Sequence, residues 1–520
     1  MSGPDHGYSN EIAYTYGYCD ELNPLRAKLA LLNAGFDYPV IRNACELGFG
    51  QGVSVNIHAA GSPVQWYGVD ADQRHTGFAR QLADDAQTHP QLSSQRFSEF
   101  CRRDDLPDFE FIGLHGVWSW ISDDDRATVT EFVARKLRTG GVLYVSYNTQ
   151  PGWAAMMPVR ELMHGHFIAS ARHDGEREPD EQQAAERIHA AIGFAQKVMA
   201  AQPGYAMVNP SVSERVKRLS EENPRYVAHE YFAHNWHPTS FLQVAQTLEP
   251  AGLSYLGSAD YRDHIDRFNL HPAQRELLAG IDDVKLREAA RDLCMNRSFR
   301  RDYWVKQPVV LDAHERRAAL RAHRVMLAIP EDAVSLKVRA ALGEVTLPEE
   351  LYRPILRVMS RDGVTTLGDI ERGVKSAGIT LDQVVEAVTL LIGMGPVLNV
   401  QDDQQTQQAH SAAVRLNTAI CERAYDSNAL QFLVSPVSGS GVSIPHVAQL
   451  FLLAAKRGLS RPQQWAEFAR AALSGRAGAS ERVGHAYVPL AFADPDLVDK
   501  AIRFADVYLP VLRMLGIDAG

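Results

Sequence analysis

The chain has 520 residues and a formal net charge of −10 at pH 7, with 45% hydrophobic and 22% charged residues. This length exceeds what one hydrophobic core supports, so we expect roughly two to four domains. The acidic balance disfavours a protein that binds nucleic acid through a broad basic surface.

Cysteine spacing and hydropathy further restrict the class of protein. The five cysteines are far apart, odd in number and without C-x-x-C spacing, which disfavours a disulfide framework and a zinc site. The N-terminus lacks a basic start followed by an apolar core, and no stretch approaches the ~20 uninterrupted apolar residues of a membrane-spanning helix. We expect a cytoplasmic protein with no membrane insertion and no bound metal.

The first stretch with a chemical signal is a glycine turn. Residues 43–52 read Asn-Ala-Cys-Glu-Leu-Gly-Phe-Gly-Gln-Gly and predict a buried strand, a turn, and then a helix over 53–60. Gly48, Gly50 and Gly52 let backbone amides approach a ligand closely. The next predicted strand, 64–70, ends in Asp70, about 20 residues on, where such folds place a ribose-binding acid. Together these features predict a nucleoside ligand.

Upstream and downstream of this turn, two assignments stay open. Tyr8, Tyr14, Tyr16 and Tyr18 either form a lid over the ligand or pack an N-terminal arm against the first domain. After Asp70 we predict a helix to about 86 and a short strand over 94–97. Ser98 and Glu99 follow at the position that would face an adenine, although Asp104 and Asp105 compete for this role.

The following two strand ends are richer in functional side chains. Residues 108–114 predict an apolar strand that runs into a loop with His115, Trp118 and Trp120. In an open parallel sheet the ligand crevice lies beyond the carboxyl ends of the strands, so we expect this loop to bind ligand. A helix over 123–138 and a strand over 142–147 come next. The strand–helix alternation predicts an α/β, doubly wound sheet.

The motifs resemble those of a known family. Glu46 precedes the glycines in the pattern E-x-G-x-G-x-G, which resembles motif I of class I S-adenosylmethionine methyltransferases. Residues 115–120 and 145–153 resemble two signature segments of bacterial methyltransferases that carry a methyltransferase regulatory domain. That family includes protein-lysine methyltransferases acting on outer-membrane proteins. Residues 229–256 and 295–302 resemble the start and end of the regulatory domain.

The resemblance implies a Rossmann-like fold, S-adenosylmethionine as cofactor, and a set of site residues. The implied cofactor-binding residues are Glu46, Gly48, Gly50, Gly52, Asp70, Ser98, Glu99, His115 and Gly116, with Glu46 at the methionine end and Asp70 at the ribose. The expected catalytic residues are His115 or Tyr147, to take a proton or hold the acceptor, and Asn148, to orient it. The expected substrate-binding residues are Trp118, Trp120, Trp153, His229, Tyr231 and Trp236.

The function implied is methyl transfer to the side-chain amine of a protein lysine, and two alternatives stay open. One is a methyltransferase acting on a sugar or small metabolite. The other is a non-catalytic adaptor that keeps the fold. Phe49 favours the adaptor, because the family usually has a small or polar residue there and a phenyl ring would narrow or reshape the pocket. The expected partner is a protein, such as an outer-membrane or surface protein, or a small acceptor, and a homodimer is plausible.

The rest of the chain is expected to be mainly helical. We assign 1–265 to the methyltransferase domain, with a helical insertion over 158–222 and the regulatory region over 225–305. The insertion either caps the acceptor side of the crevice or is an inert helical hairpin. Residues 266–340 are then a helical connector, 341–410 a winged-helix-like domain and 411–520 a helical or winged-helix-like domain. Residues 401–408 are polar and Gln-rich, which predicts a linker or exposed loop.

Overall fold

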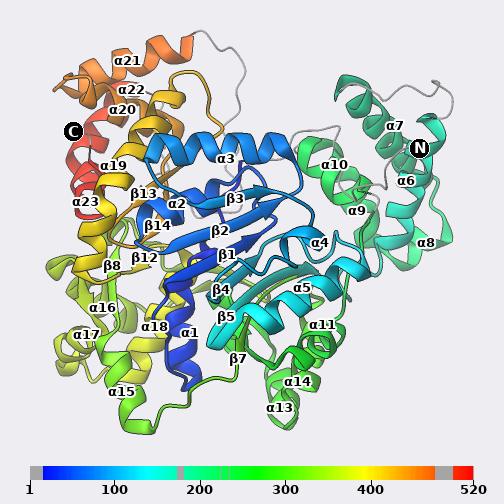
Figure 1. Ribbon diagram of the computed structural model, residues 1–520, viewed down its shortest axis with the longest axis horizontal. Coiled ribbons are helices and arrows are strands. Elements are labelled where there is room, and N and C mark those ends of the chain that lie inside the picture. The colour runs from blue at the N-terminus through cyan, green and yellow to red at the C-terminus, as the bar shows by residue number, and fades with distance from the viewer. Residues whose placement is uncertain (1–15, 172–180, 223, 234, 475–495, 519–520) are drawn as a thin grey trace.

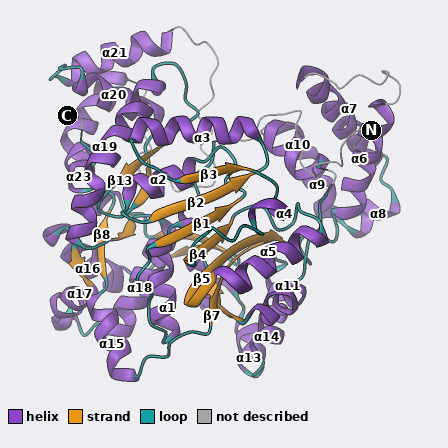
Figure 2. Ribbon diagram, in the orientation of Figure 1, coloured by secondary structure: helices purple, strands orange, loops and turns teal. Residues whose placement is uncertain are grey.

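The computed structural model describes residues 16–171, 181–222, 224–233, 235–474 and 496–518. Within these residues the centre is a seven-stranded sheet in the order β3-β2-β1-β4-β5-β7-β6, with helices on both faces (Figure 1, Figure 2). The strands are β1 (Asn43–Leu47), β2 (Gln65–Asp70), β3 (Gln91–Ser94), β4 (Phe109–Leu114), β5 (Leu137–Asn148), β6 (Leu253–Ser258) and β7 (Phe299–Lys306). This arrangement confirms the predicted doubly wound α/β fold.

The first five strands are parallel, and their order reverses between β1 and β4. Their connecting helices bury apolar faces on the two sides of the sheet. These helices are α1 (Pro24–Ala34), α2 (Val53–Gly61), α3 (Gln73–Ala86), α4 (Phe97–Phe100) and α5 (Asp123–Lys136). Because the crevice of such a sheet opens where the order reverses, the ends of β1 and β4 define the position of the site.

The last strand of the central sheet lies where a helical connector was expected. β7 lies at 299–306, inside the 266–340 segment, and pairs antiparallel with both β5 and β6. Its residues alternate between the two faces, as in a strand buried on both sides. The regulatory region therefore completes the central sheet and does not form a separate helical body.

Between β5 and the end of the sheet lies a group of helices that projects to one side (Figure 1). They are α6 (Met157–Ala171), α7 (Glu181–Ala200), α8 (Gly204–Val208), α9 (Pro210–Arg218) and α10 (Pro224–Phe232). They share a small apolar core of their own, to which Trp153, Tyr231 and Trp236 belong. α11 (Phe241–Leu248) then returns the chain to the sheet.

The C-terminal half is mainly helical, as predicted. Three helices, α12 (Asp266–Asn269), α13 (Pro272–Ala279) and α14 (Val284–Met295), lie between β6 and β7 in the chain. After β7 come α15 (Ala313–Ala322), α16 (Glu349–Asp362), α17 (Leu367–Gly373) and α18 (Leu381–Met394). Three short strands, β8 (Arg324–Leu327), β11 (Thr365–Thr366) and β12 (Val397–Asn399), form a small sheet among the last three. The winged-helix interpretation of this part stays a prediction. No helix of the described residues is long and apolar enough to span a bilayer.

The Gln-rich segment is helical, contrary to the predicted linker. α19 (Asp403–Ala424) begins directly after Asp402, whose side chain accepts a hydrogen bond from the Gln405 amide. Glutamine is a good helix former, so an N-terminal cap is enough to continue the helix through a polar stretch. The chain then finishes with β13 (Phe432–Ser435), β14 (Ser440–Ser443), α20 (His446–Lys456), α21 (Pro462–Ser474), α22 (Leu497–Arg503) and α23 (Leu509–Met514).

This C-terminal part packs directly on α2, the helix that follows the glycine turn. Gln401 donates from Nε2 to the Gly61 carbonyl over 2.8 Å, and Gly61 meets Gly439 of the β13–β14 turn. Residues of α2, α19 and α20 share one apolar core. The position of the turn is therefore fixed partly by residues more than 300 positions away in sequence.

Replacing Gly61 with alanine tests this contact. A Cβ at Gly61 would lie 3.0 Å from the carbonyl carbon of Gly439, and backbone yields less easily than a side chain. We expect the free energy of unfolding in urea to fall by about 1–3 kcal/mol. Gly193→Ala in α7 is the control, because nothing lies within 4 Å of its added Cβ. An equal effect of the two variants would contradict a tight interface.

Candidate active site

The glycine turn has the backbone that its sequence requires. Gly48, Gly50 and Gly52 have φ angles of 77°, 56° and 71°, in the left-handed region. A Cβ at Gly48 would lie 2.4 Å from Cγ2 of Val117, and one at Gly52 would lie 2.4 Å from Cβ of Ala79. The turn is thus held close to both the β4 loop and α3, and side chains are excluded from it.

Asp70 joins this turn to the end of β2. Its Oδ2 accepts a hydrogen bond from the Gly50 amide over 2.9 Å, and its Oδ1 accepts one from the Asp72 amide over 3.0 Å. His75 Nδ1 lies 3.1 Å from the same Oδ1. Oδ2 can accept a second hydrogen bond, so Asp70 can shape the loop and still bind a ligand hydroxyl.

Glu46 is a buried acid with an unused oxygen. Its side chain is 3% exposed, and its Oε2 has no hydrogen-bond partner among the described residues. Burial, with a smaller contribution from the nearby Asp70 charge, raises the pKa of Glu46 well above its usual value. An unpaired buried carboxyl oxygen is costly, and a ligand with a donor or positive group would compensate it.

Phe49, which favoured a closed pocket, turns into the protein core. Its side chain is 5% exposed and belongs to the cluster that contains Leu92 and Ala79. Gly68 of β2 makes the room, because a Cβ there would lie 2.9 Å from Cδ1 of Phe49. The phenyl ring is thus accommodated within the sheet and α3 packing.

His115, directly after β4, is surrounded by three groups that can donate to it. Its Nδ1 lies 2.8 Å from the Tyr144 hydroxyl, 3.2 Å from Sγ of Cys19 and 3.3 Å from Oγ of Ser146. Ser146 Oγ already accepts from the Gly116 amide over 2.8 Å, so its own proton is free to point at the imidazole.

These contacts assign a tautomer to His115. With Nδ1 facing the donors, the neutral ring carries its proton on Nε2. Burial lowers the pKa of His115 to about 4, despite the opposing charge of Glu21. The imidazole is therefore neutral near pH 7 and offers an N–H donor. It is poorly suited to accept a proton there.

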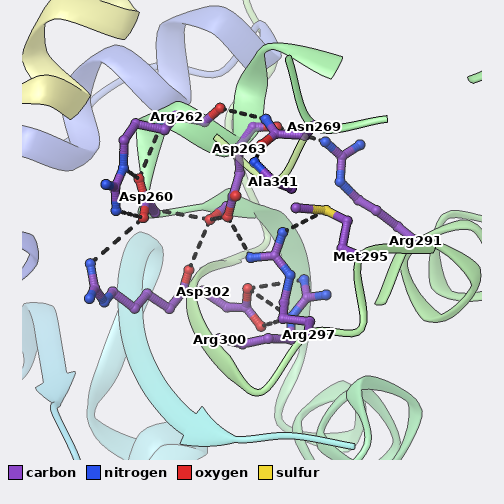
Figure 3. Close-up of polar contacts among 12 residues, drawn as sticks. Asp260, Arg262, Asp263, Asn269, Arg291, Met295, Arg297, Arg300, Asp302 and Ala341 are labelled. Atoms are coloured by element: carbon purple, nitrogen blue, oxygen red, sulfur yellow. Dashed lines mark hydrogen bonds and ion pairs between the residues drawn. The ribbon is translucent and has the colours of Figure 1, made fainter. Parts of the chain in front are cut away.

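Tyr147 lies on the opposite face of β5 from His115. Adjacent strand residues point to opposite faces, and Tyr147 sits in the core cluster of α5 and α11, whereas Tyr144 sits in the cluster of α1. The Tyr147 hydroxyl donates to Asp302 over 2.7 Å. Asp302 belongs to a group of paired acidic and arginine side chains around β7 (Figure 3). The hydroxyl near His115 is that of Tyr144.

The Tyr147→Phe variant distinguishes a structural role of Tyr147 from a catalytic one. Because the change removes one donor to the buried Asp302 carboxylate, we expect the free energy of unfolding to fall by about 1–2 kcal/mol. Cofactor affinity should stay within twofold of the wild type in titration calorimetry. Unchanged stability together with a large loss of methyl transfer would instead favour the catalytic role expected from sequence.

The two signature segments and the start of the regulatory domain meet beyond the ends of β4 and β5. Asn148 donates from its backbone amide to Oγ of Ser119 over 2.8 Å, and its carbonyl accepts from the Thr239 amide over 2.9 Å. The His237 amide donates to the Ser119 carbonyl over 2.8 Å. Residues far apart in sequence thus form one hydrogen-bonded surface around Asn148.

Glu230, which no sequence motif singled out, also reaches this surface. Its Oε1 accepts a hydrogen bond from Nδ2 of Asn148 over 2.8 Å. Burial raises the pKa of Glu230 to about 7. The only sequence signal was an acid inside the segment 229–238, where its position on α10 could not be distinguished from a solvated helix face.

The expected substrate-binding aromatics divide into two groups. Trp118 is 1% exposed in the core with Tyr147, which favours a structural role. Trp153 and Trp236 pack edge to face, 4.9 Å between centroids, and carry the guanidinium groups of Arg215 and Arg160 at 3.9 Å and 4.3 Å. Their faces are therefore partly occupied by the chain's own cations.

The remaining expected residues are spread more widely. Tyr231 is 2% exposed and its hydroxyl accepts from Arg215, whereas Trp120 and His229 are partly exposed. Ser98 and Glu99 lie on α4, where Glu99 caps the Arg96 amide over 3.3 Å. Contact of either residue with an adenine stays a prediction.

The tyrosines before α1 favour the packing alternative where the structure describes them. The Tyr18 hydroxyl lies 3.1 Å from Nε2 of His58 on α2, and Tyr16 packs against Phe78 at 5.0 Å between centroids. Tyr8 and Tyr14 lie outside the described residues.

Known proteins resemble both the sequence and the fold. A model of the "Predicted methyltransferase regulatory domain" matches residues 223–306. The uncharacterized Synechocystis protein sll1526 is 36% identical over 467 residues, which cover 88% of this chain and 89% of that protein. The chain therefore belongs to the same family as this Synechocystis protein. The Rickettsia prowazekii protein RP789 is 26% identical over 317 residues, which cover 57% of this chain and 52% of RP789.

Solved structures show the same fold over almost the whole chain. Two structures of PKMT2 from Rickettsia typhi, one in complex with AdoHcy, cover 98% of this chain and 100% of theirs. Their TM-score is 0.67 and their sequence identity 18%. The helical C-terminal half is thus part of the shared architecture.

Proposed function

We propose that this methyltransferase transfers a methyl group from S-adenosylmethionine to the side-chain amine of a protein lysine. The observation that carries the proposal is that the two signature segments and the start of the regulatory domain converge at Asn148, at the same edge of the sheet as the glycine turn. The resemblance of these segments to protein-lysine methyltransferases supports the acceptor. The PKMT2 structure in complex with AdoHcy supports the cofactor.

The residues at the turn fit this cofactor. The left-handed glycines leave space for a ligand against the backbone, and the unpaired Oε2 of Glu46 suits the positive amine of a methionine group. Asp70 would accept from the ribose hydroxyls. His115 would donate its Nε2–H to the ligand. Gly116, the next residue of the loop after β4, would lie against the ligand. When bound, the cofactor supplies a methyl group on a positively charged sulfur, ready for in-line displacement.

The acceptor amine must be neutral when it attacks the methyl group, although the pKa of a free lysine amine is ~10.4. Partial desolvation beside the aromatic residues Trp120, Trp153 and Trp236 would lower that pKa. Asn148, whose backbone is held on both sides by hydrogen bonds, would orient the group. These residues align the nitrogen and exclude water, which is the main contribution of a protein to such a displacement.

Titration calorimetry with S-adenosylmethionine and S-adenosylhomocysteine, followed by transfer of labelled methyl, tests the proposal. We expect micromolar or tighter binding of both ligands, and label in a lysine of a protein acceptor by mass spectrometry. Label in a carbohydrate acceptor alone would favour the sugar or metabolite alternative. Binding without transfer to any acceptor would favour the adaptor.

The setting of the reaction is also part of the proposal. We infer a cytoplasmic enzyme that meets its protein substrate, such as an outer-membrane or surface protein, before that substrate is exported. A homodimer and the domain divisions at 265, 340 and 410 are expectations of the same kind. Size-exclusion chromatography with light scattering would test the dimer.

A further inference from the structure

The carboxylate of Glu230 occupies a defined position at the end of β5. It lies on α10, the last helix of the projecting group before α11 returns the chain to the sheet. Oε1 accepts from Asn148 Nδ2 over 2.8 Å, and Asn148 is the last residue of β5. The acid is thus placed by contact with the same strand that carries Tyr144 and Ser146 to His115.

Asn148 is fixed so that its amide must face Glu230. Its backbone N–H and carbonyl are bonded to Ser119 and Thr239, which leaves the side chain as its free polar group. Only the Nδ2 end can donate to a carboxylate. This contact directs one oxygen of Glu230 toward the strand end and leaves Oε2 without a hydrogen bond among the described residues.

The Glu230 carboxylate is within reach of the fields of Arg215 and Arg160 but is not in direct contact with a cation in the part of the chain that the structure describes. Among the described residues no Lys, Arg or His nitrogen forms an ion pair with its carboxylate. Arg160 of α6 approaches only the backbone carbonyls of Glu230 and Ala233, while its guanidinium stacks on Trp236. A carboxylate whose only hydrogen bond comes from a neutral amide suits an incoming ammonium group.

We propose that Glu230 binds the ammonium of the acceptor lysine and removes one proton from it. This proposal rests on the proposed function and names the base that the function needs. The proton passes from the lysine nitrogen to Oε2, which leaves a neutral amine and a neutral carboxyl group. The amine lone pair then forms the new C–N bond while the S–CH₃ bond breaks and its electrons stay on sulfur. The carboxyl group returns its proton to water after the methylammonium product leaves.

The charges around Glu230 permit this role near neutral pH. Burial raises the pKa of Glu230 to about 7, and it outweighs Asn148, Arg215 of α9 and Arg160 of α6, which all lower it. Tyr226 and Tyr231 on the same helix stay neutral in this range, because burial raises the pKa of both. The acid is therefore ionised above about pH 7 and can accept a proton there. His115, with a pKa of about 4 and its proton on Nε2, cannot replace it.

The test compares wild type and Glu230→Gln, with poly-L-lysine as acceptor and labelled methyl as the readout, from pH 6 to 10.5. In the wild type kcat/KM should rise with pH through about 7. In the variant, kcat/KM at pH 7.5 should be at least ~100-fold lower than in the wild type. It should recover only as the pH approaches the pKa of a free lysine amine, ~10.4. Asn148→Ala should move the wild-type rise to higher pH, because it removes a donor to the ionised acid.

Two controls show which part of the proposal fails if the expected result is not seen: cofactor binding by the variant, and substitution of a second glutamate. Glu230→Gln should bind S-adenosylhomocysteine like the wild type, and Glu222→Gln, an exposed acid of the same region, should keep the wild-type profile. A Glu230→Gln profile identical to the wild type would overturn the proposal. A wild type that binds cofactor but does not methylate poly-L-lysine would overturn both the lysine acceptor and this role. A wild type that binds no cofactor would overturn the proposed function itself.

Discussion

Asp70→Ala is expected to weaken binding of S-adenosylhomocysteine by about 100-fold or more. Two effects act together. The change removes the carboxylate that would accept from the ribose hydroxyls, and charge-assisted hydrogen bonds of this type contribute about 1.5–3 kcal/mol. It also frees the Gly50 amide, which Asp70 holds at 2.9 Å, so the turn loses part of its preorganisation. Titration calorimetry of the folded variant measures the loss.

Asp72→Ala is the matched control for this prediction. Asp72 lies two residues further on, where its side chain caps α3 by accepting from the Arg74 amide over 2.7 Å. Its loss should cost about 1 kcal/mol of stability and little cofactor affinity. Near wild-type binding by Asp70→Ala would remove the ribose role, whereas equal weakening in both variants would point to a general disturbance of the β2–α3 connection.

The glycine turn and Asp70 could be predicted because they lie within one strand–helix–strand unit. The short distance between them along the chain fixes their contact once β1 and β2 pair. The fold class followed in the same way from alternating strands and helices. β7 was different, since it enters the sheet between β5 and β6 by pairing with a strand about 150 residues earlier. No local pattern specifies such a pairing.

On the acceptor side, the positions of single side chains also could not be predicted from local sequence. Tyr144 and Tyr147 lie on one strand, and only their packing partners decide which of them reaches His115. Glu230 sits on a helix whose orientation depends on α6, α7 and the surface around Asn148. Trp118 follows a strand end, as expected for a binding residue, yet the turn after β4 folds it into the core.

The buried charges around β7 are the part of the fold that depends most on exact pairing. Arg300, 2% exposed, donates to Asp302 over 2.9 Å, to Asp292 over 2.6 Å and to Glu288 over 3.0 Å. Arg297, beside it in Figure 3, donates to Asp263 over 2.6 Å. One guanidinium thus serves three acids on the face of the sheet opposite His115.

Arg300→Met is therefore expected to lower the free energy of unfolding by about 3–5 kcal/mol. The methionine keeps much of the volume but leaves Asp302 and Asp292 buried without this cation, and an uncompensated buried charge is costly. Urea unfolding followed by tryptophan fluorescence and circular dichroism gives the change. Because Arg300 pairs in register with Tyr147, one residue before Asn148, the acceptor side should also lose order.

Arg361→Met provides the comparison, because this exposed arginine pairs with its neighbour Asp362 in solvent. Surface pairs of this kind contribute little, so its unfolding curve should match the wild type. Adding Asp302→Asn to Arg300→Met should recover part of the lost stability, since it removes one of the unpaired charges. A small effect of Arg300→Met alone would mean that Arg297 or water compensates these acids, and that the register of β7 depends mainly on its apolar residues.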